Sequence, residues 1–171
     1  MNYQVVDNFL TREEFNKIHD TIMSTDLAWQ WADKIVDDDD LEFLHRSQFV
    51  SPFYHYSTGK RDGVEILKPI LDRLCKGKEV LRIKANLQTY SPNPTPNKFH
   101  VDMLDEDGKA IKDYYTSIFY LNTCNGATIF EDGTEIASVA NRMLTFDGEL
   151  MHTGRPASDA KRRVVINFNY K

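Results

Sequence analysis

The sequence predicts a mainly β domain with flanking helices, an α+β arrangement in which a sandwich or barrel is braced from one side. Two segments with helical periodicity come first, and a run of short strands separated by turn sequences follows them. The chain has 171 residues, which is the length of a single domain. We expect residues 1–79 to supply helical support and residues 80–171 to form the barrel core.

The composition is that of a globular protein rather than a disordered chain, a disulfide scaffold or a protein held to nucleic acid by bulk positive charge. Apolar residues make up 41% of the chain, charged residues 27%, and the formal net charge is −5. Cys75 and Cys124 form no metal-type pair, so two reduced thiols are expected. Because no export signal and no apolar run of membrane-spanning length is seen, we expect a cytoplasmic protein without a membrane partner.

Two helices are predicted in the first half of the chain. Thr11-Arg12-Glu13-Glu14 is a capping box, which predicts a helix from there to about Ser24 with Phe15, Ile18 and Ile22 on its apolar face. The second helix is expected from about Asp62 to Cys75. Between the helices, residues 37–40 predict a solvated acidic loop, and Trp29 and Trp31 are expected on a strand with their rings in the core.

Short strands separated by Gly, Asn, Asp and Pro turns account for most of the remaining chain. We expect them at residues 3–6, 80–90, 115–121, 127–131, 135–139, 142–147 and 163–170. Two of these segments alternate in polarity, as strands with one face toward a core do. The polar faces comprise Arg82, Lys84, Asn86, Gln88 and Tyr90 in one segment, and Arg163, Val165, Asn167 and Asn169 in the other. The apolar faces are expected to pack on the helices, and the polar faces to line a wet cavity.

A metal site is the best explanation for such a cavity. In His100-Val101-Asp102, two ligand-type side chains point the same way on an extended segment, and His152 follows Asp102 by 50 residues. Two histidines and one carboxylate occupy one face of an octahedral iron(II) and leave the other positions open. The His-x-Asp pair alone is common by chance, so the assignment also depends on His152, on Tyr90 and on the basic residues 161–163.

These residues resemble the iron(II)- and 2-oxoglutarate (2OG)-dependent oxygenases, above all the prolyl-4-hydroxylase-like branch and its small phage-encoded members. The resemblance covers about residues 80–170 and depends on Tyr90, His100-x-Asp102, residues 118–122, Gly126 with Phe130, residues 142–147, His152 and residues 163–168. It implies a double-stranded β-helix (a cupin-like jelly roll) with supporting N-terminal helices. It also implies the host cytoplasm as location if the gene belongs to a phage.

The resemblance implies that His100, Asp102 and His152 bind iron(II), and that a basic residue at the start of the last strand binds the far carboxylate of 2OG. Strand parity selects Arg163 over Arg162, because Arg163 shares the polar face. A guanidinium can also bind a carboxylate through two parallel hydrogen bonds.

Three further residues are implied as contacts of 2OG. The hydroxyl groups of Tyr90 and Tyr120 match contact positions of the prolyl-hydroxylase branch, and Asn167 falls inward near the same pocket. Core packing is the alternative for either tyrosine.

The implied reaction is hydroxylation of a C–H bond with O2 as co-substrate and release of succinate and CO2, with ascorbate as a candidate reductant. Asp102 favours hydroxylation, since related halogenases lack this carboxylate. Peptidyl proline is the first substrate to consider, and a small molecule is the other. The loop Met103–Asp113 is either a lid or an ordinary acidic loop, and Arg155 either meets an anionic substrate or is merely exposed.

Two other functions remain open from the sequence. One is a cupin-like barrel that binds a metal and a small ligand without oxygenase activity, which would have no need of Arg163. The other is a nucleic-acid demethylase of the same superfamily. The acidic net charge makes a nucleic-acid partner the weaker interpretation, although residues 161–163 form a local basic patch.

Overall fold

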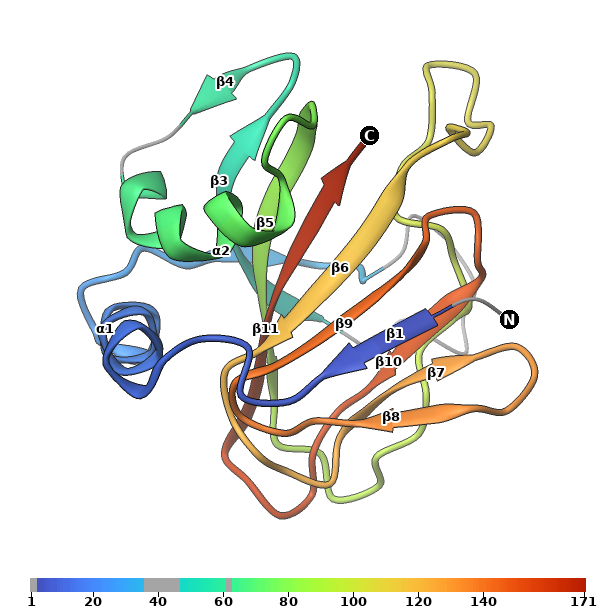
Figure 1. Cartoon of the computed structure of the whole chain (residues 1–171). Helices are drawn as coiled ribbons and strands as arrows, with labels where there is room; N and C mark the ends of the chain where they lie inside the picture. Colours follow the sequence, from blue (N-terminus) through green and yellow to red (C-terminus); the bar gives the residue numbers. More distant parts are fainter. Residues whose placement is uncertain (1–2, 36–46, 61–62) are drawn as a thin grey trace.

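Two antiparallel sheets form the fold, as seen in the computed structural model, which describes residues 3–35, 47–60 and 63–171 (Figure 1). The larger sheet has the strand order β1-β9-β6-β11-β5-β3-β2, with β4 paired to β3, and the smaller has the order β10-β7-β8. The strands are β1 (Tyr3–Val6), β2 (Gln30–Ala32), β3 (Gln48–His55), β4 (Gly59–Lys60), β5 (Val80–Thr89), β6 (Tyr115–Tyr120), β7 (Ala127–Phe130), β8 (Glu135–Ala137), β9 (Arg142–Asp147), β10 (His152–Arg155) and β11 (Arg162–Tyr170).

The two sheets face each other across a core, and this arrangement is the predicted double-stranded β-helix. Residues from β6, β9 and β11 of the larger sheet pack there against Phe130 and Ile136 of the smaller sheet. A bridge between His100 and His152 adds the segment around His100 to the edge of β10. The fold thereby brings the two predicted histidine ligands side by side at one edge of the smaller sheet.

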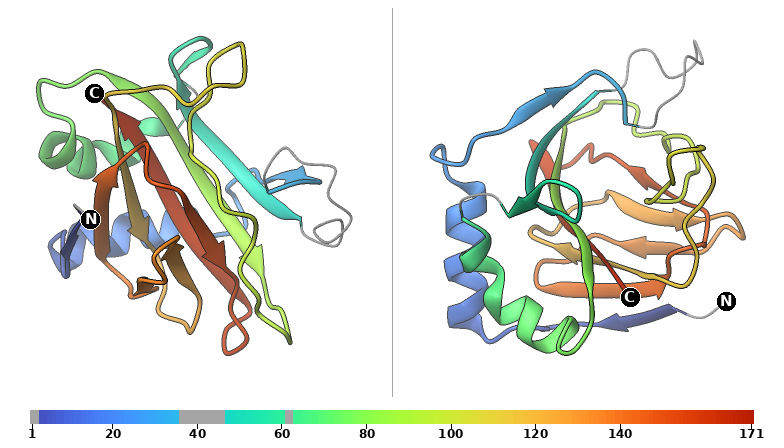
Figure 2. Two further views of the ribbon diagram at one scale, coloured as in Figure 1. Left: turned by 90° about the vertical axis from the view of Figure 1, so that its right-hand side faces the viewer. Right: turned by 90° about the horizontal axis from the view of Figure 1, so that it is seen from above.

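The outer face of the larger sheet is covered by the helices (Figure 2). Helix α1 (Arg12–Met23) begins at the predicted capping box, in which Glu14 N donates to Thr11 Oγ1 over 3.3 Å and Thr11 N donates to Glu14 Oε2 over 3.0 Å. Ile18 and Ile22 are buried against the apolar face of the sheet. On β11 this face is made of Val164, Ile166 and Phe168, as the alternation predicts.

The second helical segment is shorter than predicted and has two parts. A 3-10 helix, η2 (Val64–Leu67), precedes α2 (Lys68–Leu74), and Pro69 lies in the first turn of α2. Because proline has no N–H, it cannot donate back to the preceding turn, so the chain starts a new helix there. The predicted first residue, Asp62, lies outside the described residues, as does the acidic segment 37–40.

The sequence analysis missed strand β3, and it was wrong about one tryptophan. β3 pairs with β5 and, on its other side, with β2, so residues before position 80 contribute strands as well as helices. A register shift interrupts the pairing of β3 at Pro52. The polar and apolar residues of β3 do not alternate either, so no sequence pattern indicated this strand. Trp29 packs partly buried against the core, but Trp31 is 59% exposed because β2 is the outermost strand.

Both cysteines of the chain lie in the interior as free thiols. Cys75 and Cys124 are buried and unpaired, and burial raises the pKa of the Cys75 thiol to about 11. Within the described ranges, neither α-helix has the length and apolar character needed to cross a bilayer.

Asn141 offers a test of how the N-terminal segment is attached. Its backbone is in the left-handed region (φ 62°), and its side chain accepts from Leu10 N over 3.0 Å and donates to Leu10 O over 2.9 Å. Asn141→Ala loses both buried hydrogen bonds and places alanine at an unfavourable φ, so we expect the free energy of unfolding to fall by about 3 kcal/mol in urea titrations.

Asn141→Gly is the matched control, since glycine accepts the same φ but makes no side-chain hydrogen bond. A smaller loss in this variant, about 2 kcal/mol, isolates the contribution of the two bonds. An unchanged stability in both variants would contradict the structural role of Asn141.

Candidate metal centre

The three predicted metal ligands lie together between the two sheets. His100 N and His152 N each donate to the backbone oxygen of the other histidine over 3.0 Å, which fixes the two segments relative to each other. One ligand atom from each of His100, Asp102 and His152 lies within 4.8 Å of the other two. The residues that the sequence analysis selected for a metal site are therefore brought to one place by the fold.

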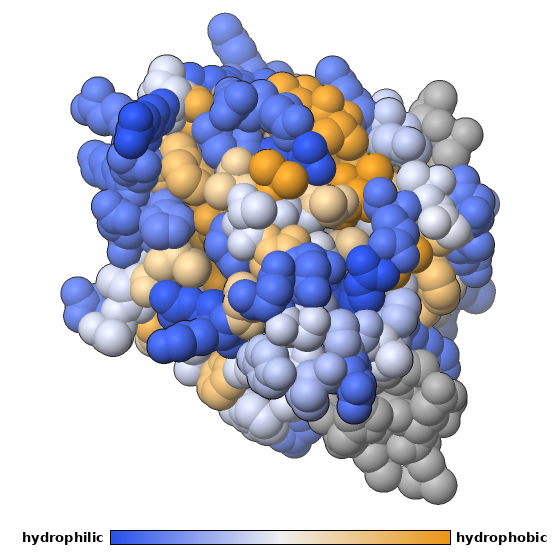
Figure 3. All heavy atoms as spheres, turned by 90° about the horizontal axis from the view of Figure 1, so that it is seen from below, coloured by the Kyte–Doolittle hydropathy of each residue, from blue (hydrophilic) through white to orange (hydrophobic). Residues whose placement is uncertain are grey.

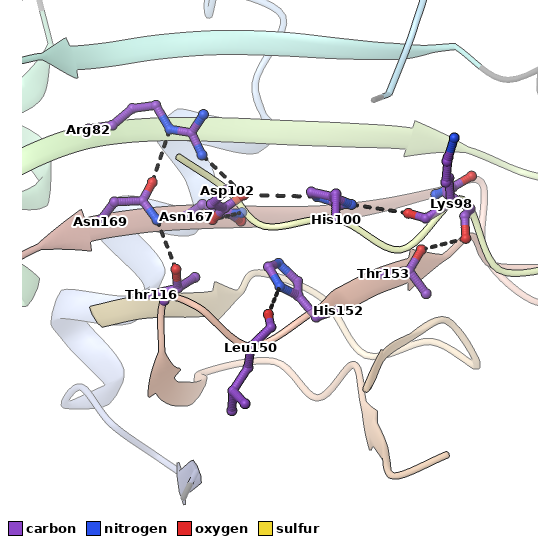
Figure 4. Close-up of polar contacts among 12 residues, drawn as sticks. Arg82, Lys98, His100, Asp102, Thr116, Leu150, His152, Thr153, Asn167 and Asn169 are labelled. Carbon is purple, nitrogen blue, oxygen red and sulfur yellow. Dashed lines mark hydrogen bonds and ion pairs between the residues drawn. The ribbon is translucent and has the colours of Figure 1, made fainter. Parts of the chain in front are cut away.

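Hydrogen bonds orient both imidazole rings for metal binding (Figure 4). His100 Nδ1 lies 3.1 Å from Lys98 O, and His152 Nδ1 lies 3.0 Å from Leu150 O. Because a carbonyl oxygen only accepts, each Nδ1 carries a proton, and Nε2 is the ring nitrogen that remains to bind a metal. Both histidines thus present Nε2 to a metal, held in place by backbone groups two residues earlier in the chain.

Three side chains from the larger sheet hold the Asp102 carboxylate. Arg82 Nη2 on β5 lies 3.1 Å from Oδ1, and the side-chain amides of Asn167 and Asn169 on β11 donate to Oδ2 over 3.2 and 3.0 Å. Arg82 Nε also donates to Asn169 Oδ1 over 3.0 Å, so the two strands are connected at the ligand (Figure 4). This network fixes the orientation of the carboxylate before any metal arrives.

The protonation states of the ligands suit a cation. Burial alone would raise the pKa of Asp102, but the positive charge of Arg82 and the hydrogen bond from Asn169 hold that pKa below its ordinary value. Burial lowers the pKa of His152, which keeps its imidazole neutral at pH 7. A deprotonated carboxylate and a neutral imidazole are the forms that bind metals.

The ligands line a small cavity, of about 60 Å³, whose walls are mostly polar. Ile118 and Val165 are the apolar residues that the two strands β6 and β11 add to it. Its polar lining consists of Gln48, Lys84, Asn86, Gln88, Asn97, His100, Asp102, Thr128, His152, Thr153, Arg163 and Asn167. The alternation of β5 and β11 therefore put their polar faces on the inside, as the sequence analysis predicts.

Arg163 lines the same cavity as the metal ligands, and only 4% of it is exposed. Its Nη2 donates to Thr128 Oγ1 over 3.1 Å and its Nη1 to Gln88 Oε1 over 3.4 Å, while Nε has no hydrogen-bond partner within the described part of the chain. No carboxylate of the described residues pairs with it. Burial lowers the pKa of this guanidinium. Because the ordinary pKa of arginine lies far above 7, the guanidinium still stays charged at neutral pH.

Gly126 leaves room for the Arg163 side chain, and Tyr120 holds Thr128, the residue to which Arg163 donates. A Cβ atom at Gly126 would come within 2.6 Å of Arg163 Cδ, so only glycine fits beside this side chain. The buried Tyr120 ring lies 5.6 Å from the guanidinium carbon, and its hydroxyl donates to Thr128 Oγ1 over 2.8 Å. Thr128 and Arg163 thus line the cavity, whereas Tyr120, one of the predicted 2OG contacts, is not among the lining residues and reaches Arg163 through Thr128.

The other predicted contact residues lie in different surroundings. Tyr90 follows the last residue of β5, is 54% exposed and lines a neighbouring pocket of about 160 Å³ instead of the metal cavity. Asn167 lines the metal cavity but donates to Asp102. Arg162 points outward, where its Nη2 donates to Met23 O over 2.9 Å.

Two more segments singled out by the sequence are bound to other parts of the protein. Arg155 Nη1 forms an ion pair with Glu135 Oε1 at 2.7 Å. In the loop Met103–Asp113, Met103 is buried with Leu81, and a bridge joins Leu104 to Ala110.

Arg82, Asn169 and Gln48 are site residues to which the sequence analysis assigned no role. The alternation placed Arg82 and Asn169 on inward faces, but it could not show that both reach Asp102, because that depends on the pairing of β5 with β11. Gln48 belongs to β3, a strand that no alternation of polar and apolar residues indicated.

Comparison with known proteins identifies this architecture. No family model and no curated protein matches the sequence, whereas solved structures match nearly all of it. A 2OG-Fe(II) oxygenase family oxidoreductase from Burkholderia pseudomallei aligns over 99% of this chain and 84% of its own, with a TM-score of 0.69 and 10% identity. The chain has the fold of the 2OG-Fe(II) oxygenases.

Prolyl hydroxylases are among the other structures of this fold that match. The viral collagen prolyl hydroxylase of Paramecium bursaria Chlorella virus-1, in complex with 2OG, aligns over 99% of this chain and 95% of its own (TM-score 0.60, 16% identity). The Trichoplax adhaerens prolyl hydroxylase, in complex with a hypoxia inducible factor peptide fragment, aligns over 98% and 82% (TM-score 0.66, 15% identity). These comparisons confirm the predicted fold class.

Removal of one ligand tests the metal centre. We expect His152→Ala and Asp102→Ala each to weaken Co²⁺ binding about a hundredfold, because each removes one of three protein donors, measured by calorimetry and by the visible spectrum of bound Co²⁺. His19→Ala is the matched control, since His19 lies on α1 beside Asp20 and Phe15. Unchanged Co²⁺ affinity in both ligand variants would exclude this site.

Proposed function

We propose that this protein is an iron(II)- and 2OG-dependent dioxygenase that hydroxylates a C–H bond of its substrate. When bound, iron(II) and 2OG supply the oxidation of the C–H bond by O2, with release of succinate and CO2. His100, Asp102 and His152 would hold the iron, and a set of three protein ligands is one that leaves room for 2OG and O2.

The observation on which this proposal depends is a buried arginine without a carboxylate partner in the cavity of the metal ligands. Burying an unpaired charge is costly, so the site of Arg163 is expected to receive an anion. A guanidinium with a free Nε and a neighbouring hydroxyl at Thr128 suits a carboxylate. A cupin-like barrel that binds only a metal has no use for this residue.

The remaining walls also fit 2OG. Ile118 and Val165 offer apolar surface to its short carbon chain, and Tyr120 orients Thr128 next to Arg163. Burial raises the pKa of the Tyr120 hydroxyl, which therefore remains a neutral hydrogen-bond donor. The viral prolyl hydroxylase of the same fold, which was solved as a 2OG complex, supports this assignment.

For the substrate, we propose peptidyl proline as the class to test first. Two structural neighbours are prolyl hydroxylases, and one of them is bound to a peptide. A second pocket, lined by Tyr90, Pro92, Asn93 and Pro156, adjoins the metal cavity, because Gln88 and Asn97 line both. We propose that an extended substrate peptide lies in this pocket and reaches the metal from there. The end of the molecule in Figure 3 shows hydrophilic residues interspersed with smaller hydrophobic areas, a surface suited to a polar peptide.

Anaerobic titration tests the cofactors directly. Addition of 2OG to the iron(II)-loaded protein is expected to produce the visible metal-to-ligand charge-transfer band of a chelated 2-oxo acid. Arg163→Ala should raise the Kd of 2OG about a hundredfold, because it removes one partner of a buried charge pair, while Co²⁺ affinity stays the same.

Arg162→Ala is the matched control, because the neighbouring arginine points away from the cavity and should leave the 2OG affinity unchanged. Absence of the band in folded, iron-loaded protein would exclude the 2OG assignment. A larger effect of Arg162→Ala than of Arg163→Ala would reverse the residue assignment.

A panel of proline-containing peptides tests the substrate. With iron(II), 2OG and ascorbate, we expect a gain of one oxygen on proline by mass spectrometry, and loss of this product in Asp102→Ala. A protein that converts 2OG to succinate but modifies no peptide of a broad panel would exclude the peptidyl-proline proposal and leave the oxygenase assignment intact.

A further inference from the structure

A second cation in the metal cavity has no assigned partner. Lys84 lies on β5, opposite Asn167 of β11 and Pro52 of β3, and its side chain lines the cavity with the metal ligands. Across the described ranges, its ammonium group forms no hydrogen bond and no ion pair. A partly buried ammonium group that points into a cavity without a partner is a binding group for an anion.

Three positively charged side chains surround the cavity, Arg82, Lys84 and Arg163, and Lys84 is the one to which the proposed function assigns no binding partner. Arg82 is paired with Asp102, and Arg163 is assigned to the far carboxylate of 2OG. Burial lowers the pKa of Lys84 to about 8. The positive charge of Arg82 lowers this pKa as well and the negative charge of Asp102 raises it, so the ammonium form still predominates at pH 7. Binding of an anion beside it would remove much of the cost of this buried charge.

The residues next to Lys84 on the cavity wall are polar as well. Asn86 follows it on the same face of β5, is buried, and its Oδ1 has no hydrogen-bond partner in the described structure. Gln48 of β3 also lines the cavity, but the pairing of Phe49 with Leu87 places it farther along, beside Gln88. An apolar group such as a proline ring alone would leave this wall unsatisfied, whereas a substrate with a charged group and amide or amine groups would satisfy it.

We propose that Lys84 binds a carboxylate of the substrate, and that Asn86, two residues along on the same face of β5, completes a polar subsite in the cavity of the metal ligands. This inference rests on the proposed function, because it assumes that 2OG occupies Arg163. The carboxylate belongs either to a free amino acid or to an acidic residue beside the target residue of a peptide, since both present the same group to the ammonium.

Acetate binding tests the subsite without knowledge of the natural substrate. Protein loaded with Zn²⁺ and the unreactive 2OG analogue N-oxalylglycine is titrated with acetate, and the Kd is taken from the amide chemical shifts of β5. We expect acetate to bind and acetamide not to bind, Lys84→Met to weaken acetate binding about tenfold, and Lys84→Arg to retain it. Lys76→Met is the matched control at an exposed lysine.

The same preparation identifies the source of the carboxylate. Competition by L-proline but not L-prolinamide assigns an amino acid, and competition by an acetyl-Gly-Pro-Asp amide but not its asparagine counterpart assigns an acidic peptide. Neutral analogues that compete as well as the carboxylates would overturn the proposal.

Two outcomes separate this inference from the proposed function. Failure of acetate to bind, or equal affinity in wild type and Lys84→Met, overturns the subsite while the 2OG charge-transfer band still supports the oxygenase. If Lys84→Met instead raises the Kd of 2OG as much as Arg163→Ala does, Lys84 is a ligand of 2OG and the substrate subsite is excluded.

Discussion

The antiparallel pairing of β5 with β11 is the interaction on which the site depends. Its register sets Arg82 opposite Asn169, Lys84 opposite Asn167 and Gln88 opposite Arg163. Because side chains alternate along a strand, the same register turns the apolar residues of both strands toward the helices. A slip of one residue would move the charged groups into the apolar core. The packing of the core and the assembly of the site therefore require the same register.

The site contains several buried charges, of which the protein compensates some and leaves others without an oppositely charged partner. Asp102 is held by Arg82 and two asparagine amides, and a bound metal would add a further positive charge. Arg163 and Lys84 have no carboxylate partner within the described structure. A cavity with two cations that lack carboxylate partners favours the binding of anionic ligands. The unpaired charges lower the free energy of unfolding, and binding of the ligands raises it again.

The metal ligands lie at the edge of the smaller sheet and the residues that orient Asp102 lie on the larger sheet, which explains why the site needs the whole fold. His152 begins β10 of the smaller sheet, and the His100 segment is bridged to it. The residues that orient Asp102 belong instead to β5 and β11 of the larger sheet. The distance between the sheets, set by Phe130 and the residues packed around it, therefore controls the geometry of the ligands.

The sequence by itself determined the local features: the capping box at Thr11, the alternation of β5 and β11, and the strand parity by which Arg163 faces inward and Arg162 outward. Each of these follows from neighbouring residues or from strand parity, which need no knowledge of distant contacts. Only the tertiary structure decided the place of β3, the exposure of Trp31, the position of Tyr90 outside the metal cavity and the contacts of Arg82 with Asp102. These depend on which strands pair and in which register, and pairing joins residues far apart in the chain.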